Sequence, residues 1–183
     1  MDITDLDLEL VRQYRLGDGQ AFMVLYKKYR NPLYSYLLSL LGSRNLADDV
    51  FQDMFLWFKQ HINAFEKVKS FKGYFFRVAR NRAMDLLKQL RKEQKQFIVD
   101  GGEALLNYPS QSFKDWSFEE VEYLNHILYK LPGEQREVVV LRVLNGYSFG
   151  EIANITGVSV STLESRFHYA KQSLVRWINA GKN

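Results

Sequence analysis

The stretch Ser148–Phe167, SFGEIANITGVSVSTLESRF, decides the fold of the second half of this chain. Ser148 and Glu151 have the spacing of a capping box, in which each side chain satisfies a free backbone N–H at the start of a helix. Gly157 suits the left-handed turn that ends such a helix, and Ser159 or Ser161 can cap a second one. The residues predicted to face inward are Ile152, Ile155, Val158, Leu163 and Phe167. This spacing predicts a helix-turn-helix.

The second helix of such a motif enters the major groove of duplex DNA. Hydroxyl groups on it can pair with base edges, and Arg166 and Lys171 can reach phosphates. Its predicted exposed positions are Ser161, Thr162, Glu164, Ser165, His168 and Tyr169. The simpler interpretation is a helical hairpin that binds nothing. The small Ala153, Gly157 and the apolar set occur together here, and this combination favours a DNA-binding motif.

Helical periodicity also dominates the rest of the chain. In the first half we expect a helix from about Phe22 to Leu41, which Asn31-Pro32 should interrupt or bend because proline lacks the amide donor. Further helices are expected over 47–58 and from about Ser70. In the second half they are expected over 119–130, 134–145, 148–156 and 160–178.

Residues 94–118 carry no sustained period and contain a Gly-Gly pair and a proline, which indicates a linker. No alternating strand pattern of useful length occurs. The sequence therefore predicts an all-α protein with two small helical domains, 1–96 and 119–183, joined by a flexible linker over 97–118.

The composition of the 183 residues excludes several classes of protein. A hydrophobic share of 46% and a charged share of 25% are typical of a globular chain. There is no cysteine, the three histidines lack metal-ligand spacing, and no Gly-rich phosphate loop occurs. We therefore expect no catalytic site, no metal, no cofactor and no enzyme. The acidic N-terminus and the short apolar runs predict a cytoplasmic protein with no direct membrane insertion.

Positive charge is concentrated in one segment. The net charge is +4, yet window 67–95 holds ten Lys and Arg residues against two acidic ones. The helix that begins near Ser70 also carries aromatic residues, of which Phe71 and Phe75 are assigned to the core. Exposed aromatics between cations are what single-stranded DNA binding needs, since each base stacked on a ring contributes roughly 1–3 kcal/mol.

An acidic group opens the helix expected over 47–58. Asp49 and Asp53 are four residues apart and share one helix face, with Asp48 beside them. Favourable interaction with the helix dipole and a solvated face explain Asp48. A metal-dependent nuclease would need further carboxylate or histidine partners, and none lies at suitable spacing.

Most of the chain resembles the sigma-70 family of bacterial transcription initiation factors. Residues 21–58 (AFMVLYKKYRNPLYSYLLSLLGSRNLADDVFQDMFLWF) and 70–92 (SFKGYFFRVARNRAMDLLKQLRK) resemble its region 2, and residues 128–177, which include the helix-turn-helix, resemble its region 4. Only the linker separates them, with no room for regions 1.1 or 3, as in the compact extracytoplasmic-function (ECF) group. The resemblance implies a factor that binds core RNA polymerase, directs it to specific promoters and assists −10 melting.

The resemblance also implies roles for individual residues. Charge pairing with the clamp helices of the largest polymerase subunit would involve Asp49, Gln52 and Asp53. Contacts with the single-stranded −10 element would involve Tyr74, Arg77, Arg80 and above all Asn81, and the loop His61–Ser70 would capture a flipped base. Contacts with the −35 duplex would involve Arg142, Ser161, Thr162, Ser165, Arg166 and His168.

Three positions depart from the family pattern. Tyr74 stands where the family often has tryptophan, and Glu164 and Tyr169 stand where basic residues are common on the recognition helix. We therefore expect altered −10 strand contacts, and weaker or altered contacts at −35. The family also implies an anti-sigma factor as a partner, with which the apolar residues of the linker are compatible.

One alternative class of function remains open. A one-component helix-turn-helix regulator would bind duplex DNA through the second half and a ligand or partner through the first half. It predicts dimers, palindromic sites and DNA binding without polymerase. A structural helical adaptor would leave the basic helix without a role.

Overall fold

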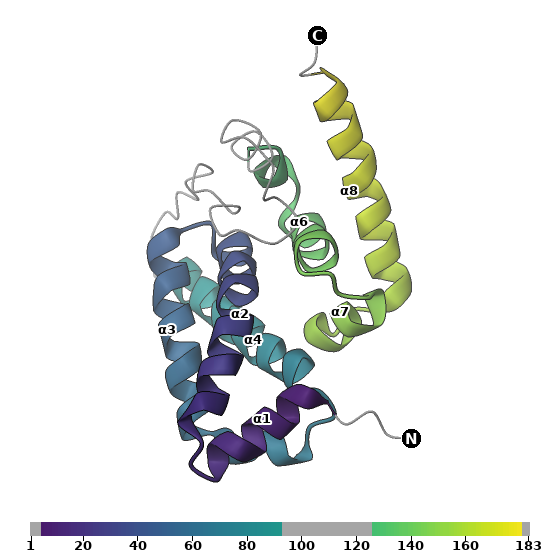
Figure 1. Cartoon of the computed structure of the whole chain (residues 1–183). Helices are drawn as coiled ribbons and strands as arrows, with labels where there is room; N and C mark the ends of the chain where they lie inside the picture. Colours follow the sequence, from purple (N-terminus) through teal and green to yellow (C-terminus); the bar gives the residue numbers. More distant parts are fainter. Residues whose placement is uncertain (1–4, 93–125, 181–183) are drawn as a thin grey trace.

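The computed structural model describes residues 5–92 and 126–180, and these residues form helices and turns with no strand (Figure 1). The all-α prediction is therefore confirmed. The segment predicted to be a linker, 97–118, lies outside the described residues. Residues 5–92 form what we call the N-terminal bundle, and residues 126–180 form the C-terminal bundle.

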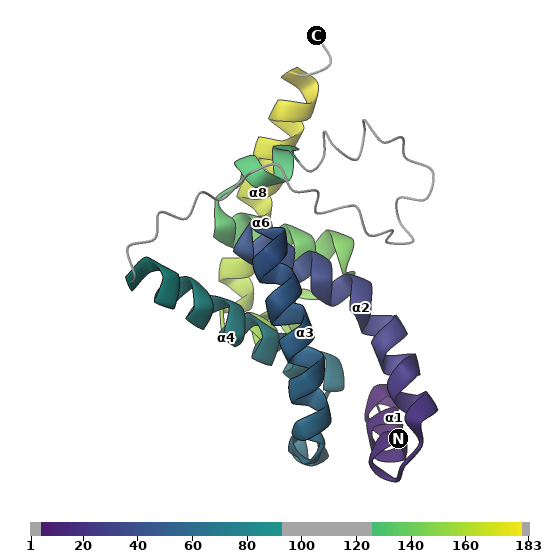
Figure 2. The same ribbon diagram turned by 90° about the vertical axis from the view of Figure 1, so that its left-hand side faces the viewer.

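The N-terminal bundle contains four α-helices and one short 3-10 helix. They are α1 (Leu6–Arg15), α2 (Gly19–Leu41), α3 (Arg44–Gln60), η1 (Ile62–Lys67) and α4 (Phe71–Lys92). Helices α2 and α3 lie side by side, and α4 packs against both of them (Figures 1 and 2).

The core of this bundle is aromatic. Phe58, Phe71 and Phe75 are almost completely buried. The rings of Phe58 and Phe71 lie 5.6 Å apart at an interplanar angle of 85°, and Phe71 stacks on Phe75 at 5.2 Å. Each such pair contributes about 0.5–1.5 kcal/mol beyond burial of its area. The assignment of Phe71 and Phe75 to the core is confirmed.

Two features of the N-terminal bundle differ from expectation. Helix α1 was not predicted; the Asp5 side chain caps it by accepting from the N–H of Asp7 at 2.9 Å, and Val11 anchors it in the core. Helix α2 is not interrupted at Pro32. Tyr29 and Leu33, on either side of the proline, are both buried. Their packing outweighs the one backbone hydrogen bond that proline cannot make.

The C-terminal bundle begins, among the described residues, with a helical stretch over 126–130. It continues through α6 (Gly133–Val139), the π-helical turn η3 (Val140–Leu144), α7 (Phe149–Thr156) and α8 (Val160–Ala180). The helix expected over 134–145 is present, and its second half is π-helical. There the N–H of Asn145 donates to the carbonyl of Val140, five residues back, at 3.0 Å.

The predicted helix-turn-helix is present in α7 and α8. Ser148 and Glu151 form the capping box, and Gly157 ends α7 with φ of 74°. The Ser159 hydroxyl accepts from the N–H of Thr162 at 3.3 Å at the start of α8. The buried residues Ile155 and Leu163 fix the two helices against the core.

The two bundles pack against each other and share one hydrophobic core. Helix α7 lies against α4, and α6 and η3 lie against α2 (Figure 1). The C-terminal part of α8 extends away from the N-terminal bundle in both views (Figures 1 and 2). Within 5–92 and 126–180, no helix combines the length and apolar character needed to cross a bilayer.

Candidate nucleic-acid interface

The acidic residues of α3 lie on one exposed face. Asp49, Gln52 and Asp53 are exposed, and Leu56 on the same side is 57% exposed. The opposite face of α3 packs into the core through residues such as Met54. The helical period therefore gives this helix an acidic outer face with an apolar residue at its end.

Of the four residues predicted at the −10 element, Tyr74 and Asn81 have their side chains on the N-terminal bundle without a hydrogen bond or ion pair to the C-terminal bundle among the described contacts. Asn81 is exposed, and Tyr74 is half-buried. The Tyr74 ring lies 5.2 Å from Phe65 and 6.2 Å from Trp57, and the Arg82 guanidinium lies 5.8 Å from the Trp57 ring. Rings with cations beside them form a surface on which a base can stack.

The other two predicted residues, Arg77 and Arg80, are bound to the C-terminal bundle. Arg80 Nε donates to the Glu137 carboxylate at 2.8 Å. Arg77 donates from both Nε and Nη2 to the backbone carbonyl of Asn154 in α7. The structure therefore places two of the four predicted residues, Arg77 and Arg80, in contact with the C-terminal bundle, and Arg77 remains exposed in that contact.

Phe76 is a further core residue of the basic helix. It is fully buried, and so it is not an exposed ring between the cations. Its ring lies 5.6 Å from Tyr36 and 5.2 Å from Tyr147, which belongs to the C-terminal bundle. Residues of both bundles cover this position, and helical periodicity within one segment does not reveal the part contributed by the second bundle.

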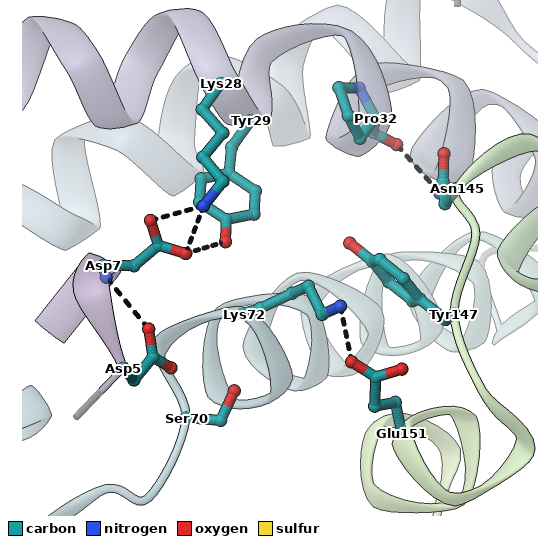
Figure 3. Close-up of a pocket in the computed structure, with 10 residues that line it drawn as sticks. All are labelled: Asp5, Asp7, Lys28, Tyr29, Pro32, Ser70, Lys72, Asn145, Tyr147 and Glu151. Atoms are coloured by element: carbon teal, nitrogen blue, oxygen red, sulfur yellow. Dashed lines mark hydrogen bonds and ion pairs between the residues drawn. The ribbon is translucent and has the colours of Figure 1, made fainter. Parts of the chain in front are cut away.

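A cavity of about 400 Å³ lies between the bundles, and polar and charged side chains from both line it (Figure 3). The buried Asp7 carboxylate accepts from Lys28 Nζ at 2.6 Å and from the Tyr29 hydroxyl. Across the cavity, Lys72 Nζ lies 2.5 Å from the Glu151 carboxylate and 4.1 Å from the centre of the Tyr147 ring. Each of these carboxylates has an ammonium partner.

Burial changes the pKa of several groups around this cavity. It raises the pKa of Tyr29, with a further rise from the neighbouring Asp7 carboxylate. Burial also raises the pKa of Tyr147. Partial burial alone would raise the pKa of Glu151, but hydrogen bonds from Lys72 and Ser148 outweigh it and lower that pKa. No group of His, Asp and Glu residues within 5–92 and 126–180 has a metal-binding arrangement.

A second cavity, of about 350 Å³, lies between the start of α4 and α7. Lys69, Tyr74 and Arg77 line it from the N-terminal bundle, and Glu151 and Asn154 line it from the C-terminal bundle. The segment His61–Ser70, expected as a loop, contains the 3-10 helix η1. This cavity therefore lies beside the predicted −10 residues and has α7 as one wall.

The first half of α8 presents a polar surface with few cations. Its exposed residues include Ser161, Thr162, Glu164, Ser165, His168 and Tyr169. Arg166 Nη2 lies 2.6 Å from the Glu134 carboxylate of α6. Arg142 donates to the carbonyl of Tyr147 at 3.0 Å and lies 5.1 Å from the Phe149 ring. The predicted −35 residues thus lie on α8 and, for Arg142, on η3.

Glu137 and Tyr36 are important residues that sequence reasoning missed. The side chain of Glu137 is only 4% exposed, and it accepts from the Tyr36 hydroxyl at 2.7 Å as well as from Arg80. Burial raises the pKa of Tyr36, and the Glu137 charge adds to this rise. The sequence does contain a signal for Glu137, because this residue directly precedes the apolar run 138–141. A carboxylate beside residues that are buried needs a hydrogen-bond or charge partner, since an unpaired buried charge is costly.

Comparisons with known proteins agree with this architecture. The family model for sigma-70 region 2 matches residues 25–93, and the model for sigma-70 region 4 matches residues 122–174. The ECF RNA polymerase sigma factor SigW of Bacillus subtilis is 28% identical over 176 residues, covering 90% of this chain and 92% of that protein. The ECF RNA polymerase sigma-E factor of Haemophilus influenzae is also 28% identical over 176 residues. That match covers 92% of this chain and 93% of that protein.

Solved structures show the same fold. CnrH, in complex with the cytosolic domain of CnrY, matches this structure with a TM-score of 0.68 and 25% sequence identity. The match covers 96% of this chain and 99% of the CnrH chain. The sigma factor RpoE from Bartonella quintana, in complex with the anti-sigma factor NepR, matches with a TM-score of 0.69 and 23% sequence identity. The match covers 86% of this chain and 96% of the RpoE chain.

Proposed function

The chain belongs to the sigma-70 family as an ECF-type transcription initiation factor, and from this premise we propose how its residues divide the work of initiation. The observation that carries the proposal is the pairing of a region 2 bundle with a helix-turn-helix of region 4 in one chain. Residues 1–96 act as region 2, residues 97–118 as the linker and residues 119–183 as region 4.

The exposed face of α3 binds core RNA polymerase. Asp49, Gln52 and Asp53 lie together on that face, and Leu56 supplies an apolar contact at its end. Carboxylates at such a surface attract basic residues of the partner, which speeds encounter and fixes the register of the complex.

Helix α4 holds the melted −10 strand. Tyr74 offers a ring for base stacking, Asn81 offers an amide for a base edge, and Arg77 and Arg80 reach the backbone phosphates. The cavity beside Tyr74 accepts a base flipped out of the stack. The cost of unstacking that base is met by its contacts in the cavity.

Helix α8 reads the −35 duplex. Ser161, Thr162, Ser165 and His168 contact base edges, while Arg142 and Arg166 contact the phosphates. Glu164 and Tyr169 replace cations on this surface, and so we expect a smaller dependence of −35 binding on salt than in relatives with basic residues there.

An anti-sigma factor is the proposed negative regulator. In the two solved structures described above, CnrH is in complex with the cytosolic domain of CnrY, and RpoE is in complex with the anti-sigma factor NepR. Both are similar to this chain over most of its length, which supports a partner of the same kind. The expected location of the chain is the cytoplasm, with the polymerase and the chromosome.

The test is co-elution of the purified protein with bacterial core RNA polymerase, combined with transcription from a genomic DNA library in the same samples. We expect a stable complex and new start sites that require the protein. The competing one-component regulator instead predicts a dimer that binds palindromic duplexes in the absence of polymerase. Dimerisation without polymerase binding would overturn the proposed function.

A further inference from the structure

We propose that the stacked rings of Trp57 and His61 form a base-stacking site at the end of α3, where one unpaired base of the melted strand stacks on the exposed ring of His61. Trp57 is the positioning residue that supports this ring. The inference rests on the proposed function, because it takes the melted −10 strand as the ligand. It adds a DNA contact on α3, the helix assigned to polymerase binding.

Two planar rings lie almost parallel at this site. The centres of the Trp57 and His61 rings are 5.0 Å apart, and their planes differ by 14°. Trp57 is half-buried and meets the buried Phe65 ring edge-on at 6.0 Å, whereas His61 is exposed. The pair therefore consists of an inner ring that the core supports and an outer ring that a base can reach.

A hydrogen bond fixes the orientation of the outer ring. His61 Nδ1 lies 3.0 Å from the carbonyl oxygen of Trp57, and because a carbonyl only accepts, Nδ1 carries the proton and donates it. The backbone N–H of His61 donates to the same carbonyl at 2.9 Å. The end of α3 is thus capped by the backbone alone, and the additional bond from the side chain holds the imidazole flat against the indole.

An exposed ring held in one orientation suits an unpaired base. Histidine is among the side chains on which the bases of single strands stack. Single-strand sites combine such rings with cations that follow the phosphates. Arg82 of α4 supplies the cation here, since its guanidinium lies 5.8 Å from the centre of the Trp57 ring. Ring and cation come from two different helices, so their arrangement depends on the packing of α3 against α4.

This site is separate from the ring of Tyr74 and lies next to it. The centres of the Trp57 and Tyr74 rings are 6.2 Å apart, and their planes differ by 45°. Because His61 is almost parallel to Trp57, a single flat base cannot stack on both His61 and Tyr74. Each ring therefore takes a different nucleotide, and His61 provides a second contact beside the cavity that Tyr74 lines.

The site also lies away from the contact between the bundles at Arg80. Arg80 and Arg82 are two residues apart, which places them on nearly opposite sides of α4. Arg80 donates to Glu137 of the C-terminal bundle, whereas Arg82 lies beside Trp57. Access to His61 therefore requires no change in that contact.

Helix α3 would thus contact two partners along its length. Asp49 and Asp53 lie on its exposed acidic face, and Trp57 and His61 follow toward its C-terminal end. A rigid helix that touches both polymerase and DNA fixes the position of the melted strand relative to the polymerase. Stacking on a ring accepts any base, so this contact adds affinity and register more than sequence selectivity.

The first experiment separates stacking from helix capping. His61→Phe keeps a ring and loses the hydrogen bond to the Trp57 carbonyl, whereas His61→Gln keeps a donor and loses the ring. Each variant is combined with core polymerase and titrated with a fluorescein-labelled single-stranded oligonucleotide that has the non-template −10 sequence of a promoter found by the transcription assay. We expect His61→Gln to weaken binding about tenfold, the loss of one stacked base, and His61→Phe to retain it.

The matched control is His126→Gln, the same change at an exposed histidine of the C-terminal bundle. It should bind the oligonucleotide as the wild type does. If His61→Gln binds normally, or if His61→Phe loses as much affinity as His61→Gln, stacking on this ring is wrong.

The second experiment identifies the stacked nucleotide. One base at a time is replaced by an abasic site along the oligonucleotide. Stacking predicts one position at which loss of the base weakens wild-type binding about tenfold and does not weaken binding of His61→Gln further, because the two changes remove the same contact. A purely structural role of His61 would weaken binding of every oligonucleotide alike, and the absence of such a coupled position would overturn the inference.

The role of Trp57 is tested by rescue. Trp57→Leu removes the supporting ring and should weaken binding at the same nucleotide position, whereas Trp57→Phe keeps an aromatic ring and should restore it. The double variant Trp57→Leu/His61→Gln should bind no more weakly than His61→Gln alone, since Trp57 acts through His61. Additive losses would exclude the positioning role. A thermal melt separates loss of fold from loss of contact, and the His61 variants change only an exposed side chain.

The two hypotheses fail in different ways. If the wild type and all variants fail to bind core polymerase, the proposed function is wrong. If they bind polymerase and start transcription, and the abasic series shows no position coupled to His61, the proposed function stands and the stacking site on α3 is wrong.

Discussion

At the scale of single residues, Asp53 on the exposed face of α3 gives a direct test of polymerase binding. Asp53→Lys reverses a charge on that face without touching the core, since Asp53 is exposed. We expect binding to core polymerase to weaken by about tenfold or more, because a like charge facing the basic partner replaces an attraction by a repulsion. Quantitative co-elution measures this effect.

The control for that change is Asp85→Lys on α4. The Asp85 side chain is 76% exposed, and the substitution alters the net charge by the same amount. It should leave polymerase binding unchanged. If both variants lose binding equally, the loss reflects net charge and the assignment of the α3 face is wrong.

Tyr74 carries the second residue-scale prediction. Tyr74→Ala removes the ring that lines the cavity between α4 and α7. Stacking of one base on a ring contributes roughly 1–3 kcal/mol, so we expect promoter opening to fall about tenfold or more. Tyr74→Trp keeps an aromatic face and should retain opening. Permanganate footprinting of the −10 region measures it, and a thermal melt checks that the contacts of Tyr74 with Phe65 and Trp57 are not needed for folding. Equal opening by the Ala and Trp variants would exclude stacking on this ring.

The aromatic residues of α4 also show what single residues reveal in the sequence. Phe71 and Phe75 were assigned correctly to the core because they lie four residues apart on the face that packs into their own bundle. Phe76 packs against Tyr36 of its own bundle and against Tyr147 of the second bundle. Helical periodicity reports the packing of one segment and carries no information about a distant cover.

At the scale of elements, two glycines of the helix-turn-helix should respond in opposite directions to the same change. Gly157 has φ of +74°, so Gly157→Ala should cost about 1–2 kcal/mol through backbone strain although no atom blocks the new Cβ. Gly150 lies inside α7, where a Cβ would meet only the Ser148 hydroxyl at 4.0 Å. Gly150→Ala should stabilise by about 0.4–1 kcal/mol, because alanine has less freedom in the unfolded chain.

Chemical denaturation of the two alanine variants measures both effects. The Gly150 variant serves as the control, since it adds the same methyl group to the same motif. A destabilisation of equal size in both variants would show that crowding, and not the left-handed turn at Gly157, determines the cost.

The elements with strong local signals were the ones that sequence reasoning predicted. The capping box at Ser148 and the turn at Gly157 depend on residues within a few positions of each other, and both predictions are confirmed. Continuation of α2 through Pro32 depends on burial on both sides of the proline, which local chemistry does not contain. Helix α1 was not predicted because the first twenty residues are mostly polar and acidic; the Asp5 cap and tertiary packing of residues such as Val11 stabilise it.

At the scale of the whole molecule, three buried tyrosines link folding to alkaline pH. Burial raises the pKa of Tyr29, Tyr36 and Tyr147 above the ordinary value of 10.0. The folded protein therefore keeps three protons that the unfolded chain releases near pH 10. Their contribution to stability is complete below pH 10 and is lost as the pH rises above it.

We therefore expect the free energy of unfolding to fall as the pH rises beyond 10, with tyrosinate formation at these residues accompanying loss of helical circular dichroism. Tyr147→Phe should remove one of the late-titrating protons and reduce the steepness of the fall. Complete ionisation of all tyrosines while the helical signal is unchanged would contradict the prediction.

The arrangement of the two bundles could not be predicted from the sequence. Glu137 and Tyr36 are separated by 101 positions and Glu137 and Arg80 by 57. A contact over such a distance leaves no period and no spacing in the chain. The sequence indicates a basic helix and a carboxylate beside an apolar run. It does not indicate that Arg80 of that helix contacts the Glu137 carboxylate.

The π-helical turn η3 affects how the two bundles pack against each other. A π-helical turn contains one residue more than the α-helical turn it replaces, and each residue rotates an α-helix by about 100°. Deleting Val143, which is 51% exposed, would convert the turn to α-helix and swing Asn145 and Tyr147 around the axis, away from α2 and Phe76. The π-helical turn thus sets the angle at which the helix-turn-helix leaves α6, and a change of chain length by one would shift the contacts that join the two bundles.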